Sequence, residues 1–409
     1  MIRYEVQTIS RCRNCCSAQV SPFLTLPSMP LTDAFRAADD RGDEFLHPIE
    51  IFLCLDCGLS QIQHNVSVSK YYEDYRYTSA ASGFVQRFMR DLAAEIWRKW
   101  GLRKGDSVIE IGSGDGAQLK CFQELGARVL GFEPSAVLTE ASRKSGVPAL
   151  KQLYTTGSEK DIPSDMVPAN VVLLTYTFDH LQDPTSFART VLPLIDRERG
   201  LLVIEVHDFE KILERREFCL FEHEHTIYPT AATLQDVLGR AGFDVIDIGV
   251  LPEKCRRANS LLVVATPKGA QFSAQAVPLL QKGRSSDLNA CAEFGRGIEE
   301  SMRRLRKFVE GRRARGVRIA GYGAGGRGVM TLAVMAKPGE VAYVCDLNQS
   351  FHGYFTPGAH VPVVPPSRLE EDPVDELVVF SFGYYQEILD SLGGFLARGG
   401  KVYSLLDLL

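Results

Sequence analysis

The stretch SVIEIGSGDG, residues 107–116, decides the fold of this chain. Its first five residues are typical of a buried β-strand, and the three glycines after them favour a sharp turn into a helix. Glycine lets the backbone turn tightly and approach a bound ligand closely. The stretch therefore predicts the strand, turn and helix of an α/β sheet that binds its ligand at the carboxyl end of the strand.

Similar strand-like runs follow this stretch along the chain. ARVLGFE, NVVLLTY and GLLVIEV alternate with helical stretches and predict a mostly parallel sheet between about residues 105 and 267. A second alternation begins at VRIAGYG, residues 317–323, and predicts a second Rossmann-like sheet. An amphipathic helix is expected over about 82–100, and an arginine-rich connecting helix, interpreted as a solvated face, over about 284–315.

The first glycine turn has the form E-x-G-x-G-x-G, and two ligands compete for it. A dinucleotide would bring a pyrophosphate to the helix N-terminus. The acidic Glu110 and Asp115 instead favour a cationic sulfonium, and Glu133, which ends the next strand, is placed to accept hydrogen bonds from ribose hydroxyls. We therefore predict an S-adenosylmethionine site formed by Glu110, Gly112, Gly114, Gly116 and Glu133.

The second glycine turn, GYGAGGRG at residues 321–328, also opens a helix. Its spacing suits a phosphate at a helix N-terminus, and Asp346 follows as a possible ribose acceptor. On this pattern alone a nicotinamide dinucleotide and a nucleoside diphosphate fit equally well. A nucleotide-sugar would explain both glycine turns in one reaction.

The N-terminal region is turn-rich and contains two Cys-x-x-Cys pairs, Cys12 with Cys15 and Cys54 with Cys57. Two such pairs complete the tetrahedral four-sulfur shell of structural zinc, which leaves no open position for catalysis. Redox cysteines and chance pairing are the alternatives. Residues 1–70 carry six Lys or Arg against eight Asp or Glu, which argues against a nucleic-acid-binding zinc module.

Length and composition set the frame for these motifs. The 409 residues predict two or three domains, for which we expect the bounds 1–75, 76–270 and 271–409. The 45 % hydrophobic and 24 % charged composition is that of a soluble globular protein, and the net charge of −5 argues against a polyanion binder. We find no signal-peptide pattern and no apolar run of roughly 20 residues, so we expect a cytoplasmic protein with reduced cysteines.

A cluster of histidines and carboxylates marks the remaining chemistry. In FEHEHTIY, residues 221–228, a strand would place Glu222 and Glu224 on one face and His223 and His225 on the other. A neighbouring carboxylate can hold a histidine in the tautomer that a general base needs. A second metal site and a solvated polar loop are the alternatives. His180 stands at the end of a predicted strand, where α/β enzymes bind ligands.

The order of these motifs resembles that of a known family. CxxC…CxxC, then YRYTS with Tyr75 and Tyr77, ExGxGxG, EHEHxxxY, GYGAxxxG and a late D-x-N…PG run resemble the bacterial three-domain sugar C-methyltransferases over nearly the whole chain. The resemblance implies a zinc-binding domain, a central class I methyltransferase domain and a C-terminal Rossmann-like domain that helps to hold a nucleotide-sugar. The expected reaction is methylation of a carbon beside the ketone of a nucleotide-activated 4-keto-deoxysugar.

The resemblance also implies roles for individual residues. His225 resembles the base that removes the α-proton, Glu224 its hydrogen-bonded neighbour, and Tyr228 the tyrosine that closes the motif. His180 resembles a further active-site histidine, and Tyr75 or Tyr77 the active-site tyrosine. The residues expected to bind the substrate are Glu222, His223, Tyr322, Gly323, Asp346, Asn348 and Gly353.

Three departures from the family pattern fall near the expected substrate surface. Glu222 replaces a tyrosine, Phe382 and Gly383 replace a Trp-Asn pair, and residues 258–260 replace Gly-Gly-Ser. They permit an O- or N-methyltransferase of another acceptor. A nicotinamide-dependent oxidoreductase that uses the 321–328 turn and a zinc-stabilised binding protein are two further alternatives. We expect a small-molecule partner, no nucleic acid or membrane, and a monomer or homodimer.

Overall fold

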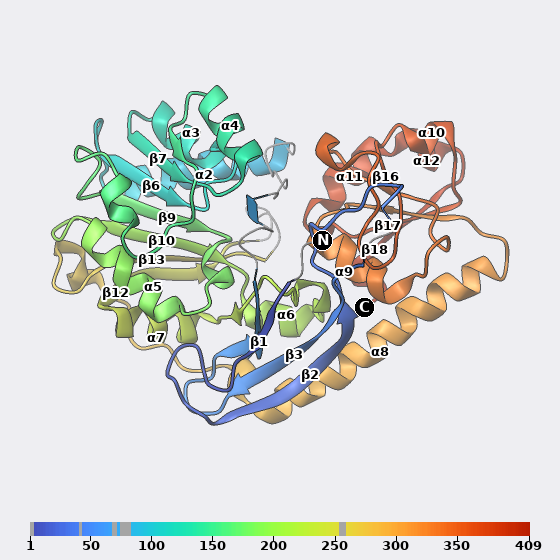
Figure 1. Ribbon diagram of the computed structural model, residues 1–409, viewed down its shortest axis with the longest axis horizontal. Helices are drawn as coiled ribbons and strands as arrows, with labels where there is room; N and C mark the ends of the chain where they lie inside the picture. The colour runs from blue at the N-terminus through green and yellow to red at the C-terminus, as the bar shows by residue number, and fades with distance from the viewer. Residues whose placement is uncertain (1–3, 41–42, 68–71, 74–82, 253–258) are drawn as a thin grey trace.

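The computed structural model describes residues 4–40, 43–67, 72–73, 83–252 and 259–409. Two α/β lobes stand side by side, and the N-terminal strands and the long helix α8 run beneath and between them (Figure 1). Among the described residues, no helix combines the length and the apolar character that crossing a bilayer requires.

The central lobe contains a seven-stranded sheet that confirms the predicted α/β class. All pairs from β10 through β8 are parallel, whereas β13 runs antiparallel to both β10 and β12. In sheet order the strands are β12 (Phe243–Val250), β13 (Leu261–Pro267), β10 (Leu201–Val206), β9 (Val171–Thr175), β6 (Ser107–Ile111), β7 (Arg128–Phe132) and β8 (Ala149–Leu150).

Helices cover both faces of this sheet. The strands are therefore buried on both faces, which explains their continuous apolar runs in the sequence. On one face pack α2 (Gly83–Lys99), whose apolar stripe contains Phe88, Leu92 and Ile96, and α3 (Ala117–Glu124). On the other pack α5 (Pro184–Val191) and α7 (Ala231–Ala241). Two further helices, α4 (Ala136–Lys144) and α6 (Phe209–Arg215), complete the lobe.

The C-terminal lobe contains a second sheet, as the sequence predicts, and every pair in it is parallel. Its order is β16 (Val363–Val364), β15 (Val344–Cys345), β14 (Ile319–Tyr322), β17 (Glu376–Val379) and β18 (Lys401–Ser404). Its helices are α9 (Gly326–Met335), α10 (Arg368–Glu371), α11 (Tyr385–Ser391) and α12 (Gly393–Ala397).

The N-terminal strands form a sheet that a strand of the central lobe completes. Its order is β11 (Ile227–Tyr228), β4 (Ser60–Ile62), β3 (His47–Cys54) and β2 (Val20–Met29), all antiparallel. Two short strands, β1 (Val6–Thr8) and β5 (His64–Val66), pair beside it. Because β11 directly follows the EHEH segment, the N-terminal sheet holds one end of that segment in place.

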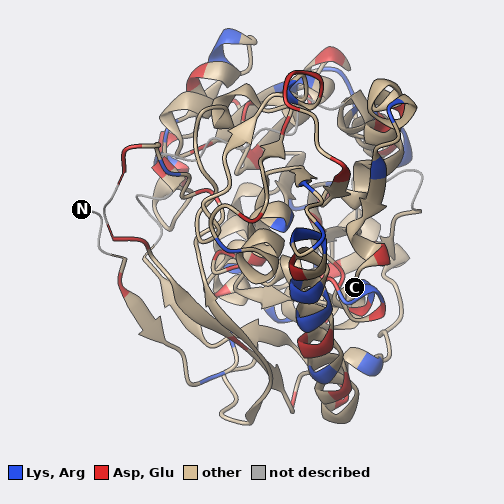
Figure 2. Cartoon of the chain, turned by 90° about the vertical axis from the view of Figure 1, so that its right-hand side faces the viewer, with Lys and Arg blue, Asp and Glu red and all other residues tan. Residues whose placement is uncertain are grey.

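Helix α8 (Leu288–Arg313) joins the lobes and packs on the N-terminal sheet. Segments coloured for Lys or Arg and segments coloured for Asp or Glu alternate along this helix (Figure 2). The expectation of a solvated face holds for the exposed Arg303 and Lys307. Arg306 and Arg312, however, pair with Glu340 and Glu376, carboxylates of the C-terminal lobe that are only 7 % exposed. The connector therefore also fastens that lobe.

Two glycines of α8 give a matched test of this packing. A Cβ at Gly295 would lie 2.2 Å from the Phe23 carbonyl oxygen of β2, whereas one at Gly311 would meet nothing within 4 Å. Gly295→Ala should therefore destabilise the protein by about 1–3 kcal/mol through overpacking. Gly311→Ala should stabilise it by up to about 1 kcal/mol, the helix propensity difference. Urea unfolding followed by circular dichroism measures both, and equal midpoints for the two variants would contradict this packing.

Candidate active site

A cavity of about 630 Å³ opens between the lobes, and all three parts of the chain line it. Thr32 and Asp33 come from the N-terminal region, the first glycine turn from the central lobe, and the second glycine turn from the C-terminal lobe. Both glycine turns thus face one space, in which two ligands can meet.

The first glycine turn has the backbone that its sequence predicts. Gly112, Gly114 and Gly116 adopt positive φ angles of 77°, 55° and 79°, which favour glycine. A Cβ at Gly112 would lie 2.3 Å from Thr177 Oγ1. Gly112 and Gly114 line the cavity, while Gly116 lies behind the wall at the start of α3.

Two carboxylates flank this turn on the cavity wall. Glu133 accepts hydrogen bonds from the Gly114 N–H (2.9 Å) and the Ser135 N–H (2.7 Å), and burial raises its pKa to about 7. Glu110 accepts one from the Thr175 hydroxyl at 2.7 Å. A ligand that donates hydrogen bonds or carries positive charge suits this wall better than a phosphate does.

The EHEH segment forms a turn rather than the strand that its alternation suggests. The His225 N–H donates to the Glu222 carbonyl at 3.2 Å, and regular pairing begins only at Ile227. The chain reversal brings Glu222, Glu224 and His225 to the cavity wall. The His223 ring lies behind the wall, where Nε2 donates to the Met29 carbonyl (3.0 Å) and Nδ1 meets His64 Nε2 (2.9 Å). The geometry thus brings three residues of the segment together and leaves the expected substrate contact of His223 out.

His225 is held in one tautomer. Its Nδ1 lies 2.9 Å from the Leu220 carbonyl oxygen, which can only accept, so Nδ1 carries the proton and the neutral ring keeps a lone pair on Nε2. Burial lowers the pKa of His225, but the carboxylates of Glu222 and Asp179 raise it more, so that the net pKa is raised. The Leu220 carbonyl orients the ring. This differs from the expected orientation by Glu224, whose Oε1 accepts from the Thr32 N–H (3.1 Å) and hydroxyl (3.2 Å).

A second histidine lies against His225. The His180 ring centroid is 4.8 Å from that of His225, and His180 Nδ1 is 2.8 Å from the Tyr72 hydroxyl. Burial, with a further contribution from His225, lowers the pKa of His180 well below its usual value, so His180 is neutral. Tyr75 and Tyr77, the tyrosines that the sequence suggests for this site, lie outside the described residues. Tyr72 is a further tyrosine of this region that the sequence patterns do not single out.

Asp179 and Tyr176 lie near the two histidines, whereas Tyr228 lies outside the cavity lining. Asp179 Oδ1 is buried, 4.0 Å from His180 Nε2, and has no hydrogen-bond partner among the described residues. The ligand atoms of Asp179, His180 and His225 lie within 4.8 Å of one another. Among the described residues, no such cluster includes Glu222, His223 or Glu224. Tyr176 on the cavity wall adopts φ of 51°, an unusual backbone for tyrosine that sequence patterns do not reveal. Tyr228 is buried against Phe221, outside the cavity lining.

The C-terminal lobe contributes Tyr322, Gly323, Asp346 and Asn348 to the cavity wall, while Gly353 lies outside its lining. Asp346 accepts hydrogen bonds from the Ala324 N–H (2.6 Å) and the Asn348 N–H (2.7 Å) and so holds the second glycine turn. Glu222 reaches across to this turn, since a Cβ at Gly326 would lie 2.3 Å from its Oε1. Burial raises the pKa of Glu222 to about 7.

Arg327, inside the second glycine turn, is a cavity residue that the sequence reasoning missed. Its guanidinium lies over the Phe382 ring at 5.0 Å. The Nε and Nη2 atoms are buried without a hydrogen-bond partner among the described residues. Buried guanidinium donors are costly when unpaired, so this arrangement suits an anionic ligand. A positively charged residue within the glycine turn GYGAGGRG is the sequence feature that could have indicated it.

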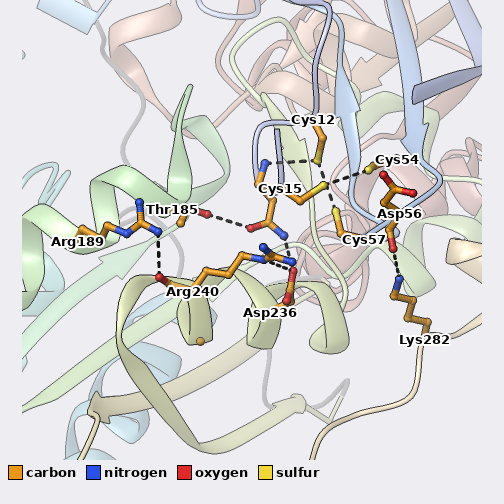
Figure 3. Close-up of polar contacts among 12 residues, drawn as sticks. Cys12, Cys15, Cys54, Asp56, Cys57, Thr185, Arg189, Asp236, Arg240 and Lys282 are labelled. Carbon is orange, nitrogen blue, oxygen red and sulfur yellow. Dashed lines mark hydrogen bonds and ion pairs between the residues drawn. The ribbon is translucent and has the colours of Figure 1, made fainter. Parts of the chain in front are cut away.

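The four cysteines of the CxxC pairs converge on one point (Figure 3). The sulfurs of Cys12 and Cys57 are 3.5 Å apart and those of Cys15 and Cys54 3.6 Å apart, and all four are free thiols. Thiolates bound to tetrahedral zinc at about 2.3 Å lie about 3.8 Å from one another. The donor set therefore fits a structural zinc ion.

Three family models match the chain in order. A zinc-binding domain matches residues 12–72, a methyltransferase domain residues 81–248, and a C-methyltransferase C-terminal domain residues 260–406. The C-methyltransferase NovU of Streptomyces niveus is 27 % identical over 403 residues, which cover 97 % of this chain and 95 % of the relative. Taken together, the three models and this relative make the chain similar to C-methyltransferases over nearly its whole length.

Solved methyltransferases are also similar to part of this chain. The magnesium protoporphyrin IX methyltransferase of Synechocystis PCC 6803, with bound SAM, is 15 % identical and covers 45 % of this chain and 80 % of its own, with a TM-score of 0.34. The 1,6-didemethyltoxoflavin-N1-methyltransferase of Burkholderia thailandensis is 16 % identical and covers 44 % and 79 %, also with a TM-score of 0.34.

The family models and the relative NovU show an S-adenosylmethionine-dependent methyltransferase with an N-terminal zinc-binding domain. Its α/β architecture, with the central class I methyltransferase fold, agrees with the sequence-based expectation.

Proposed function

We propose that this enzyme methylates a carbon beside the ketone of a nucleotide-activated 4-keto-deoxysugar. The observation that carries the proposal is the pairing, in one cavity, of a tautomerically fixed histidine with a buried arginine that has unpaired donors. A base is needed for C-methylation because carbon must first lose a proton. The arginine supplies the anion recognition that a sugar diphosphate requires.

The donor binds, in this proposal, at the first glycine turn. Glu133 receives the ribose hydroxyls, and Glu110 with Asp115 faces the cationic end of the ligand. When bound, S-adenosylmethionine supplies an electrophilic methyl group on a sulfonium.

His225 acts as the base. Its Nε2 accepts the α-proton of the ketone, and the Leu220 carbonyl keeps Nδ1–H aimed away from the reacting carbon. The carboxylates of Glu222 and Asp179 stabilise the resulting imidazolium, consistent with the raised pKa of His225. The Tyr72 hydroxyl and the ring of the neutral His180 share one hydrogen bond, so the group that accepts it keeps an O–H or N–H to donate to the enolate oxygen. The carbanion would then attack the sulfonium methyl group, so that a carbon–carbon bond forms as the carbon–sulfur bond breaks and S-adenosylhomocysteine leaves; proximity in the shared cavity contributes much of the rate.

The acceptor is held, in this proposal, by the C-terminal lobe. Arg327 and the N–H groups that begin α9 bind the diphosphate. Tyr322, Asp346 and Asn348 line the same part of the wall. We place the enzyme in the reducing cytoplasm, because all nine described cysteines are free and the four zinc ligands must stay reduced.

Replacement of His225 tests the base. His225→Gln should abolish methyl transfer and also the exchange of the acceptor α-proton with D2O, by at least about 10²-fold. Both are measured on a dTDP-4-keto-6-deoxyhexose, by mass spectrometry and proton NMR. His360→Asn, at an exposed histidine that pairs with Glu44, is the matched control and should leave both rates unchanged. Persistent exchange in the His225 variant would assign the base elsewhere.

Replacement of Arg327 tests the acceptor site. Arg327→Met should weaken binding of dTDP by about 10- to 100-fold, since a hydrogen bond to a charged group contributes about 1.5–3 kcal/mol. The affinity for S-adenosylhomocysteine should not change. Arg303→Met, at an exposed arginine of α8, is the control. Calorimetric titration that finds equal dTDP affinities for wild type and Arg327→Met would remove the arginine from the acceptor site.

A further inference from the structure

The two residues between the first pair of zinc ligands are buried. Arg13 is 6 % exposed and Asn14 5 % exposed, although both carry strongly polar side chains. Spacer residues that served only to bring Cys12 and Cys15 together could face solvent. Their burial indicates that residues 12–15, here called the Cys12–Cys15 knuckle, make contacts with other parts of the chain beyond those needed to bind zinc.

Arg13 contacts two separate parts of the chain. Its guanidinium donates to the carbonyls of Ile62 (3.2 Å) and His64 (2.8 Å) and to Asn65 Oδ1 (2.7 Å) in the N-terminal sheets. It also donates to the Gln182 carbonyl at 3.1 Å. Gln182 lies two residues after His180, so Arg13 holds the segment that carries this histidine.

All of these acceptors are neutral oxygens, and burial lowers the pKa of Arg13 to about 10. Its Nε has no hydrogen-bond partner among the described residues. A buried guanidinium paired only with neutral groups is a poor source of stability. Its fork geometry, however, fixes several backbone segments at defined distances.

The same knuckle reaches the segment that carries His225. The Arg13 N–H donates to Gln61 Oε1 at 2.8 Å, and Gln61 of β4 pairs with Ile227 of β11, two residues after His225. Thr226 closes the connection: its carbonyl accepts from the Ile62 N–H (3.1 Å), and its own N–H donates to the Asp179 carbonyl (2.8 Å). Both histidine segments therefore meet at the strand that Arg13 holds.

Asn14 also contacts elements that follow each of the two histidine segments. Its Oδ1 accepts from the Thr185 hydroxyl (3.0 Å) at the start of α5, and its Nδ2 donates to Asp236 Oδ2 (2.7 Å) on α7. Thr185 follows the His180 segment and Asp236 follows the His225 segment in the chain. Figure 3 shows Thr185 and Asp236 beside the four cysteines.

We propose that the Cys12–Cys15 knuckle sets the spacing of His180 and His225, with Arg13 and Asn14 as positioning residues. Zinc then contributes to catalysis by fixing the knuckle from which both histidine segments are held. The role assigned to the two histidines rests on the proposed function. The contacts of the knuckle do not, so they can be tested separately.

Arg13→Met removes the fork and keeps an unbranched, apolar side chain. Arg11→Met is the matched control, because Arg11 is exposed, flanks the same knuckle and uses its side chain only on the Cys16 carbonyl among the contacts of the described residues. Hydrogen–deuterium exchange by mass spectrometry, calorimetry with S-adenosylhomocysteine, and α-proton exchange of a dTDP-4-keto-6-deoxyhexose are measured on both full-length variants with zinc bound.

Arg13→Met should speed amide exchange in residues 178–186 and 220–229 but not in 107–135, the donor turn. Affinity for S-adenosylhomocysteine should stay within about threefold, while α-proton exchange should fall by about 10- to 100-fold in kcat, as expected for a displaced catalytic group. Arg11→Met should change none of these. If Arg13→Met does not fold, Asn14→Ala is measured in the same way, with the same outcomes expected.

Two results would overturn the proposal. One is faster amide exchange throughout the central lobe together with weaker S-adenosylhomocysteine binding, which indicates general destabilisation. The other is behaviour of Arg13→Met that matches that of Arg11→Met. If instead wild type fails to exchange the acceptor proton, the proposed function fails, and the amide-exchange pattern alone still decides whether the knuckle positions the two segments.

Discussion

One hydrogen bond, from His225 Nδ1–H to the carbonyl of Leu220, sets the chemistry of this site. It leaves Nε2 as the basic nitrogen of a buried ring whose pKa nearby carboxylates raise. A histidine in this state is suited to take a proton from carbon. This hydrogen bond requires the turn at 222–225 to hold its position relative to Leu220. Strand β11, which pairs with β4, fixes the end of that turn in the N-terminal sheet.

All three parts of the chain contribute residues to one cavity, as the proposed reaction requires. The central lobe supplies the donor turn and the histidines, and the C-terminal lobe supplies a second glycine turn with Arg327. The N-terminal zinc-binding part contributes strand β4, which pairs with β11, the strand that follows the turn at 222–225. A shared apolar core of residues from β2, β3, α8 and the C-terminal sheet keeps these parts in register.

Sequence patterns predict those features of the structure that interactions within short segments determine. The glycine turn at 107–116, the two α/β sheets and the four-cysteine cluster follow from spacing and hydrophobic runs that short segments contain. The direction of His223 could not be predicted, because a four-residue turn shaped by its surroundings replaces the alternating strand. Tyr72 and Arg13 were overlooked because their roles depend on partners more than 100 residues away in sequence, His180 and Gln182.

The tautomer of His225 is the most direct test of this account. Nitrogen NMR of ¹⁵N-histidine-labelled enzyme, with the signal assigned by comparison with His225→Gln, reports which ring nitrogen carries the proton. The account predicts a ring that titrates above pH 6.5 and, once neutral, is protonated on Nδ1 with Nε2 bare. A neutral ring protonated on Nε2, or one that titrates below pH 6.5, would contradict it.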